Sequence, residues 1–141
     1  LLDRIADPGN MGTIFRSALW FGVEDIILGE DCVDPYNPKV VRSRMGAIAS
    51  LNLHRWDKPN LSLAEWKDAG GEVAALHMTG MTLNEYRPAA GLLLIIGSEA
   101  HGVTPDLLQS SQKLSIKKSG KGESLNAAMA TAIALYDLSR H

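Results

Sequence analysis

Residues 91–102 read GLLLIIGSEAHG and give the strongest indication of the fold. Five aliphatic side chains follow one another at residues 92–96 without polar alternation, which is typical of a parallel strand covered on both faces. A glycine loop follows directly, at the carboxyl end of this strand, where parallel sheets bind their ligands. Glu99 in this loop is either a functional carboxylate or a cap for the next helix. His101 is more simply an incidental residue than a catalytic base.

Short β-like segments alternate with helical segments on both sides of this run. The alternation predicts an α/β fold with a mostly parallel sheet and helices on both faces. The expected strands are residues 1–4, 25–28, 52–56, 72–76, 91–96 and 113–116, and the expected helices are residues 11–21, 38–45, 61–69, 105–110 and 125–139.

The last predicted helix is apolar almost all round. Residues 125–136 read LNAAMATAIALY, and a helix of this kind is usually buried on every side. In a domain of 141 residues a surface helix normally keeps one polar face. We therefore expect a second subunit to cover it, with exposed alanines as the alternative.

Composition and charge limit the function classes. A chain of 141 residues fits one domain, and its formal net charge of −2 is not that of a strongly basic nucleic-acid binder. If the domain acts on RNA, local basic patches, a partner or another domain must contribute. The single cysteine, Cys32, excludes an intrachain disulfide and a cysteine-based metal site, and the four histidines show no ligand spacing. We expect no metal.

The sequence was also searched for membrane spans, a signal peptide and a natural start. No run of 18 or more apolar residues indicates a membrane span, and no signal peptide is recognisable, so we expect a cytoplasmic protein without a membrane partner. The chain opens on Leu1-Leu2-Asp3, which resembles the end of a strand, and it has no initiator methionine. We expect an upstream RNA-binding domain or extension to be missing.

Two further glycine loops stand out. Residues 7–16, DPGNMGTIFR, join the first predicted strand to the first helix, and residues 119–126, SGKGESLN, lead into the last helix. Both also fit plain capped turns, with Asn10 as the first N-cap and Ser124 as the last. Arg16 lies off the apolar stripe of its helix, so packing does not explain it. The glycine spacing argues against both a triphosphatase phosphate loop and a dinucleotide fingerprint.

Taken in order, the three loops resemble the three motifs of the SpoU-type RNA ribose 2′-O-methyltransferases of the SPOUT superfamily, and the likeness covers essentially the whole chain. Two departures are Ala6, where the family often has glutamine, and Lys117-Lys118, where it often has Pro-Met. The matching residues are Asp7, Pro8, Asn10, Gly12 and Arg16, then Gly97, Glu99 and Gly102, then Ile116, Gly120, Glu123, Ser124, Leu125 and Asn126.

The resemblance implies a fold, a cofactor and partners. The carboxyl-terminal part would be tied in a deep trefoil knot, and its loops would bind S-adenosylmethionine. A homodimer would pack the second and third motifs and the last helix together, which agrees with the apolar helix. The substrate would be RNA, either tRNA or rRNA, methylated on a ribose 2′-hydroxyl.

The resemblance also assigns residues. Arg16 would act on the hydroxyl, as the base or, because a guanidinium stays protonated, by holding a phosphate and the oxyanion. Asn10, Glu99, Ser124 and Asn126 would complete the catalytic pocket, with Asn10 positioning Arg16 or the substrate. The cofactor would contact Ile96, Gly97, Gly102, Ile116, Gly120 and Leu125. The candidate RNA contacts are Arg42, Arg44, Lys117, Lys118 and Lys121.

Two other functions stay open at this point. One is a non-catalytic knotted module for RNA binding or assembly, against which the retained polar motif residues argue. The other is a tRNA base methyltransferase of the same superfamily, against which Arg16 and the Glu-Ser-Leu-Asn run argue.

Overall fold

A computed structural model of the chain describes residues 1–43, 47–89 and 91–140. Six strands form one sheet in the order β3-β2-β1-β5-β4-β6, and every pairing is parallel. In chain order the elements are β1 (Leu2–Asp3), α1 (Pro8–Trp20), β2 (Asp25–Leu28), α2 (Pro38–Ser43), the short helix η1 (Ala47–Ser50), β3 (Asn52–Arg55), α3 (Pro59–Asp68), β4 (Glu72–Thr82), β5 (Leu92–Gly97), α4 (Pro105–Gln109), β6 (Gln112–Ser115) and α5 (Ala127–Leu138). The predicted α/β class and parallel sheet are confirmed.

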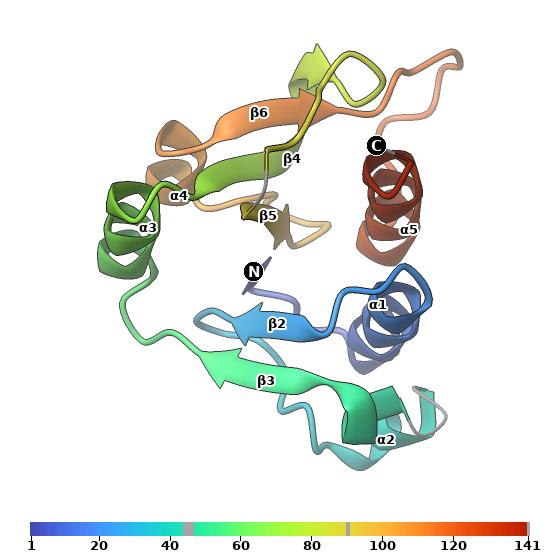
Figure 1. Cartoon of the computed structure of the whole chain (residues 1–141). Coiled ribbons are helices and arrows are strands. Elements are labelled where there is room, and N and C mark those ends of the chain that lie inside the picture. Colours follow the sequence, from blue (N-terminus) through green and yellow to red (C-terminus); the bar gives the residue numbers. More distant parts are fainter. Residues whose placement is uncertain (44–46, 90, 141) are drawn as a thin grey trace.

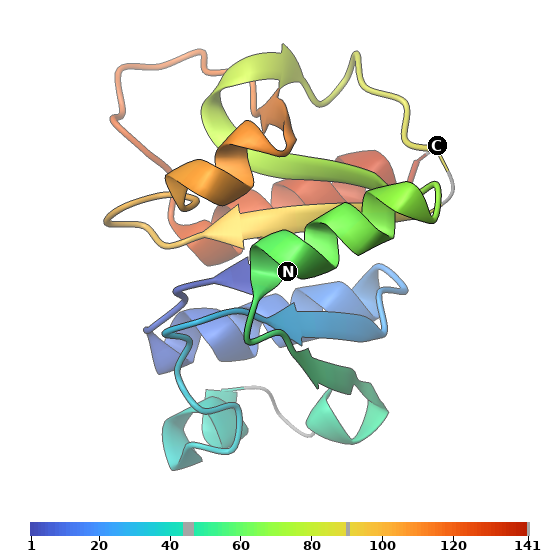
Figure 2. The same cartoon turned by 90° about the vertical axis from the view of Figure 1, so that its left-hand side faces the viewer.

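Helices cover both faces of the sheet (Figures 1 and 2). Helices α1 and α5 pack on one face, where Phe15 is fully buried beside Ala128 and Ile96. Helices α3 and α4 lie on the other face, where Leu63 and Leu107 join Leu93 and Ile95 in a second cluster. Strand β5 therefore buries side chains on both faces, which explains why its sequence does not alternate.

Helix α1 begins three residues earlier than predicted, and its N-cap is Asp7 rather than Asn10. The Asp7 carboxylate accepts the Asn10 amide N–H at 2.8 Å, and Pro8 occupies the first turn, where its missing N–H costs nothing. The prediction for Asn10 was wrong because it ignored Pro8 as a start signal. The Asn10 side chain is therefore not used to cap the helix.

Strand β4 runs six residues beyond its predicted end at Leu76, to Thr82. Both Leu76 and Met81 pair with Leu114 of β6, so residues 77–80 bulge out between them. Gly80 makes this excursion feasible: its φ is +133°, and a Cβ there would lie 2.4 Å from the Lys113 carbonyl oxygen. The other boundaries agree within two residues, except that the predicted end of α2 falls outside the described residues.

Helix α5 is capped by Asn126, not by Ser124: the Asn126 side chain accepts the N–H groups of Ala128 and Met129 at 2.9 and 3.2 Å. One side of the helix is buried within the chain. The other side exposes large apolar side chains, namely Met129 at 58%, Ile133 at 38% and Tyr136 at 54%. The chain itself therefore covers only one face of this apolar helix. Among the described helices, none could span a membrane.

Candidate active site

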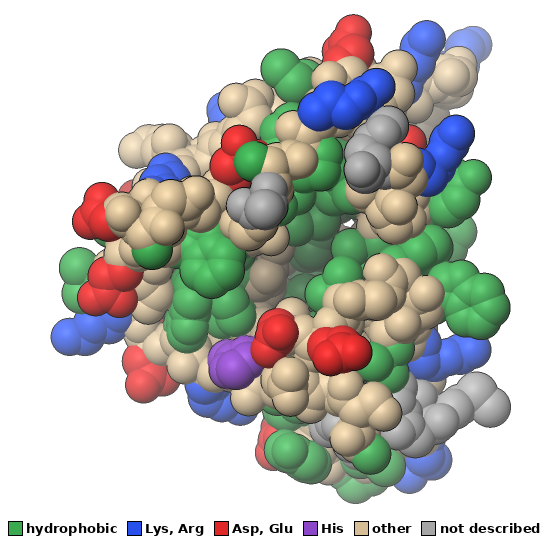
Figure 3. All heavy atoms as spheres, viewed as in Figure 1, with side chains coloured by type: hydrophobic (Ala, Val, Ile, Leu, Met, Phe, Trp, Pro, Cys, Tyr) green, Lys and Arg blue, Asp and Glu red, His purple; other side chains and the backbone are tan. Residues whose placement is uncertain are grey.

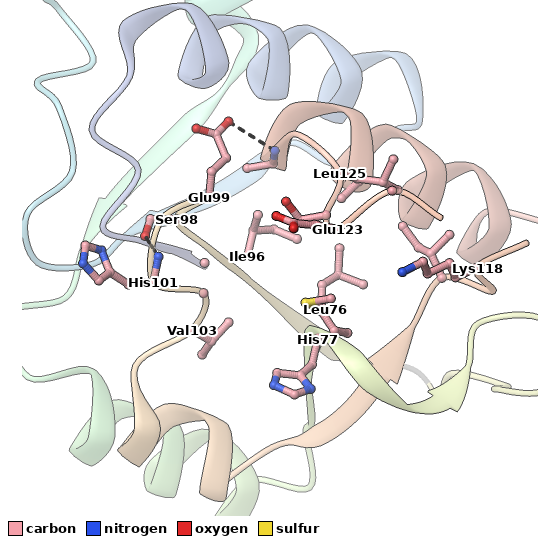
Figure 4. A pocket seen from close by; sticks show the side chains of 18 of the residues that line it. Leu76, His77, Ile96, Ser98, Glu99, His101, Val103, Lys118, Glu123 and Leu125 are labelled. Atoms are coloured by element: carbon pink, nitrogen blue, oxygen red, sulfur yellow. Dashed lines mark hydrogen bonds between the residues drawn. The ribbon is translucent and has the colours of Figure 1, made fainter. Parts of the chain in front are cut away.

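A cavity of about 700 Å³ opens at the carboxyl ends of the central strands (Figure 4). The loop after β5 lines one side, the segment after β6 lines the other, and Leu76 and His77 at the β4 bulge lie below. Cavities of this size hold small molecules and cofactors. The second and third predicted loops therefore meet at one site, as the sequence indicated.

The loop after β5 folds back on itself in a tight turn. A Cβ on Gly97 would lie 2.2 Å from backbone atoms of Gly102 and Val103, so only glycine fits there. The Ser98 carbonyl accepts the Gly102 N–H at 2.8 Å, and the Ser98 hydroxyl accepts the His101 N–H at 3.2 Å. This turn presents backbone groups toward the cavity.

Two residues at the end of β1 hold this loop in place. Asp3 is only 4% exposed, and its Oδ2 accepts the Thr104 backbone N–H and hydroxyl, each at 2.6 Å. Arg4, in the left-handed region at φ 57°, donates to the Gly102 carbonyl at 3.2 Å. We did not anticipate this latch of Asp3 and Arg4 from the sequence.

Three polar side chains, one from each motif, meet at the rim of the cavity. Asn126 Nδ2 donates to Glu99 Oε1 at 2.7 Å and to Asn10 Oδ1 at 2.9 Å, and Asn10 Nδ2 donates to Glu99 Oε1. Glu99 also accepts the Ala127 N–H at 3.3 Å, the contact drawn in Figure 4. Glu99 thus contributes to the start of α5. The alternative that it caps the next helix, α4, is wrong, because Thr104 occupies that position.

The SpoU rRNA methylase family model matches residues 1–136, almost the whole chain. The chain belongs to this family. Its sequence is 35% identical to an uncharacterised tRNA/rRNA methyltransferase of Synechocystis and 34% identical to the 23S rRNA (guanosine(2553)-2′-O)-methyltransferase of Bacillus subtilis, over 99% and 98% of this chain. It covers 52% and 56% of those proteins, so it spans about half the length of these relatives.

Solved structures of the SpoU family have the same fold. A TrmH-family RNA methyltransferase of Porphyromonas gingivalis superposes with a TM-score of 0.93 at 36% identity, covering 99% of this chain and 57% of that one. The SpoU methyltransferase AviRb of Streptomyces viridochromogenes, solved with AdoMet, gives a TM-score of 0.88 at 31% identity, covering 99% and 58%.

All six residues expected at the cofactor line the cavity. The predicted catalytic residues Asn10 and Asn126 lie at its rim through their bonds to Glu99, and the basic pair Lys117 and Lys118 lies on its wall. The further predicted residues among its lining are Ile96, Gly97, Glu99, Gly102, Ile116, Gly120, Ser124 and Leu125.

Among the catalytic predictions, all of which lie in the described part of the chain, Arg16 alone neither lines the cavity nor bonds to a residue that does. It is exposed on α1 and is not part of the cavity lining. It lies six residues after Asn10, which is roughly 9 Å along the helix axis at 1.5 Å per residue. Within the described residues, no hydrogen bond or ion pair holds its guanidinium, and Asn10 bonds to Glu99 and Asn126 instead.

The other basic candidates are dispersed. Lys121 lies in the segment after β6, outside the lining itself, and Arg42 is exposed in the last turn of α2. Arg44 lies outside the described residues. No metal-binding group of three histidine, cysteine or acidic side chains occurs among the described residues.

A second cavity of about 670 Å³ is mainly apolar. It is lined by Leu1, Ile27 and Trp66 among others, and hydrophobic side chains surround a hollow in the middle of the face in Figure 3. Ile96 is the one predicted site residue in its lining. The first cavity, which joins the motif loops, is therefore the candidate active site.

Proposed function

We propose that this chain is the catalytic domain of an S-adenosylmethionine-dependent RNA methyltransferase that modifies a ribose 2′-hydroxyl. The network of Asn10, Glu99 and Asn126 carries the proposal, because it joins one residue of each motif at the rim of a cofactor-sized cavity. The named activity of the Bacillus subtilis relative supports the ribose as the target.

The cavity suits S-adenosylmethionine in size and chemistry. Leu76, Ile96 and Val103 offer apolar surface for the adenine ring, and the backbone of the Gly97–Gly102 turn offers donors and acceptors. The Glu99 and Glu123 carboxylates suit a ligand with an ammonium and a sulfonium. When bound, this cofactor supplies an activated methyl group.

Arg16 would act on the RNA. A guanidinium keeps its proton and binds phosphate in a bidentate manner, so it positions a phosphate beside the target ribose and stabilises the developing oxyanion. A phosphate oxygen or water then takes the hydroxyl proton. Lys117, Lys118 and Lys121 give the segment after β6 a positive charge suited to further phosphates. Asn10 orients the substrate through the rim network.

A homodimer would complete this site. Met129, Ile133 and Tyr136 expose apolar surface along α5, and Trp20 at the end of α1 is 84% exposed. A stripe of this kind indicates an interaction surface. We propose that two copies pack through it, so that Arg16 of one subunit serves the cavity of the other. The trefoil knot belongs to the same proposal, supported by the contact of Glu99 with Asn126 and Ala127 across the two loops.

The test is methylation of RNA by the whole protein that carries this chain. Ribosomal RNA and tRNA are incubated with methyl-labelled S-adenosylmethionine, digested to nucleosides and analysed by mass spectrometry. We expect label on 2′-O-methylated nucleosides. Label on a base would replace the ribose assignment. Cofactor binding without label in any RNA would indicate a binding module.

A further inference from the structure

The β4 bulge places a histidine in the cavity that no motif includes. His77 is the first of the four bulged residues, and it lines the cavity with Leu76 and Val103 (Figure 4). Ser115 holds the excursion, because its hydroxyl donates to the Gly80 carbonyl at 3.1 Å. The position of His77 is therefore set by the fold.

Contacts with Thr79 surround one of the two ring nitrogens of His77. The Thr79 backbone N–H points at His77 Nδ1 from 3.1 Å, and the Thr79 hydroxyl lies at 3.1 Å as well. The Thr79 carbonyl is at the same distance and would accept a hydrogen from Nδ1 in the other tautomer, whereas the N–H and the hydroxyl both suit a tautomer in which Nδ1 accepts. In that tautomer the neutral ring carries its hydrogen on Nε2.

Within the described residues, Nε2 of His77 has no protein partner. The neighbouring side chains in the cavity, Leu76 and Val103, are apolar and cannot accept a hydrogen bond. A donor beside apolar surface in a ligand-sized cavity is typical of groups that orient a ligand.

We propose that His77 is a cofactor-binding residue, whose Nε2–H donates to an acceptor of S-adenosylmethionine. The inference rests on the proposed function, since it concerns the same cavity. A neutral donor fits this ligand better than a cation does, because the ligand carries a net positive charge. Lysine or arginine at this position would repel it, whereas an imidazole can donate a hydrogen bond from its uncharged form.

Binding measurements test the proposal without relying on catalysis. Calorimetry with S-adenosylmethionine is carried out on the wild type, His77→Ala, His77→Gln and His54→Ala. His54 is exposed, is bonded to Asp25 at 2.9 Å and lies outside the cavity, so it serves as the matched control. Loss of one hydrogen bond predicts a Kd about three- to tenfold higher for His77→Ala. His77→Gln, which keeps a donor, should recover part of the lost affinity. His54→Ala should bind S-adenosylmethionine with the wild-type Kd.

Nuclear magnetic resonance gives an independent readout. With ¹⁵N-labelled histidine, we expect His77 in the free protein to show the Nε2–H tautomer and its Nε2 signal to shift when S-adenosylmethionine is added. Unchanged affinity in His77→Ala together with an unmoved signal would overturn the role of His77. A wild-type protein that binds no S-adenosylmethionine would instead overturn the proposed cofactor, and this inference with it.

Discussion

The two walls of the cavity differ in how the chain holds them. The fixed wall, residues 97–103, is tied by its own turn, by the Asp3–Thr104 bonds and by the bond from Arg4 to Gly102. The open wall, residues 117–125, is exposed throughout, and within the described residues no hydrogen bond joins it to the rest of the protein. Only Asn126, at its end, is anchored to Glu99.

This difference predicts that the two walls respond differently when a ligand binds. A wall fixed by its own hydrogen bonds is already shaped for its ligand and loses little entropy when the ligand binds. A wall without such bonds must be ordered by the ligand, by RNA or by a second subunit.

The largest effect concerns Arg16, which belongs to neither wall. We expect Arg16→Ala to lower kcat about 100- to 1000-fold, as loss of an oxyanion donor does, while the Kd for S-adenosylmethionine stays the same. Arg16→Lys should recover little, because an ammonium cannot bind phosphate in a bidentate manner. Single-turnover kinetics and calorimetry separate the two quantities. Near-normal turnover of the lysine variant would argue against this role.

The next effect concerns the open wall. Trypsin should cut the free protein first after Lys117, Lys118 or Lys121, which lie in this exposed segment. If the bound form resists cleavage, S-adenosylmethionine at 100 times its Kd should slow this cleavage about 100-fold. Peptide mapping by mass spectrometry measures the rate at each site. A Lys117→Gln/Lys118→Gln/Lys121→Gln variant is the control, since it removes the protected sites. Equal rates with and without cofactor would show that the open wall does not order on binding.

A third effect concerns the latch of the fixed wall. Asp3→Ala leaves the partly buried N–H and hydroxyl of Thr104 without an acceptor, so we expect the free energy of unfolding to fall by about 1–3 kcal/mol. The Kd for S-adenosylmethionine should rise with it, because the Gly97–Gly102 turn loses its support. Urea unfolding and calorimetry measure both.

The control is Asp57→Ala, which removes an exposed carboxylate elsewhere and should change stability by less than about 0.5 kcal/mol. Asp3→Asn keeps one acceptor oxygen, so its loss of unfolding free energy should lie between those of Asp3→Ala and Asp57→Ala. An Asp3→Ala protein with wild-type stability and affinity would contradict the latch.

The sequence also predicted some features of the fixed wall and not others. The apolar run of β5 predicted a buried strand and a ligand loop at its end, because burial on both faces leaves a direct trace in composition. The Asp3–Thr104 contact left none, since its partners are 101 positions apart and neither belongs to a periodic pattern. A contiguous stretch of sequence indicates local structure, but it does not show which distant residues will form a contact.

The remaining errors have specific physical causes. The strand was predicted to end at Leu76, yet Gly80 allows β4 to bulge and resume, so the prediction did not place His77 at the cavity. Asn10 looked like a cap because the apolar stripe begins after it, whereas Pro8 had already started the helix. Arg16 was correctly identified as a residue that packing does not explain. Its absence from the lining of the cavity in the same chain could not be predicted, because it depends on the three-dimensional structure.

The smallest effect comes from a residue far from both walls, and it checks that the contrast is local. Tyr86 is buried and donates to Glu72 Oε2 at 2.7 Å, and burial, with the bond to this carboxylate, raises the pKa of Tyr86 to about 12. The unfolded chain loses this proton near pH 10 and the folded chain does not, so stability should decline as the pH rises from about 10 to about 12.

Tyr86→Phe should cost about 1 kcal/mol at neutral pH and make this decline shallower, measured by urea unfolding across the pH range. The Kd for S-adenosylmethionine at neutral pH should not change, because neither Tyr86 nor Glu72 lines the cavity. A raised Kd in this variant would mean that stability anywhere in the sheet governs the site, and the latch on the fixed wall would then have no special role.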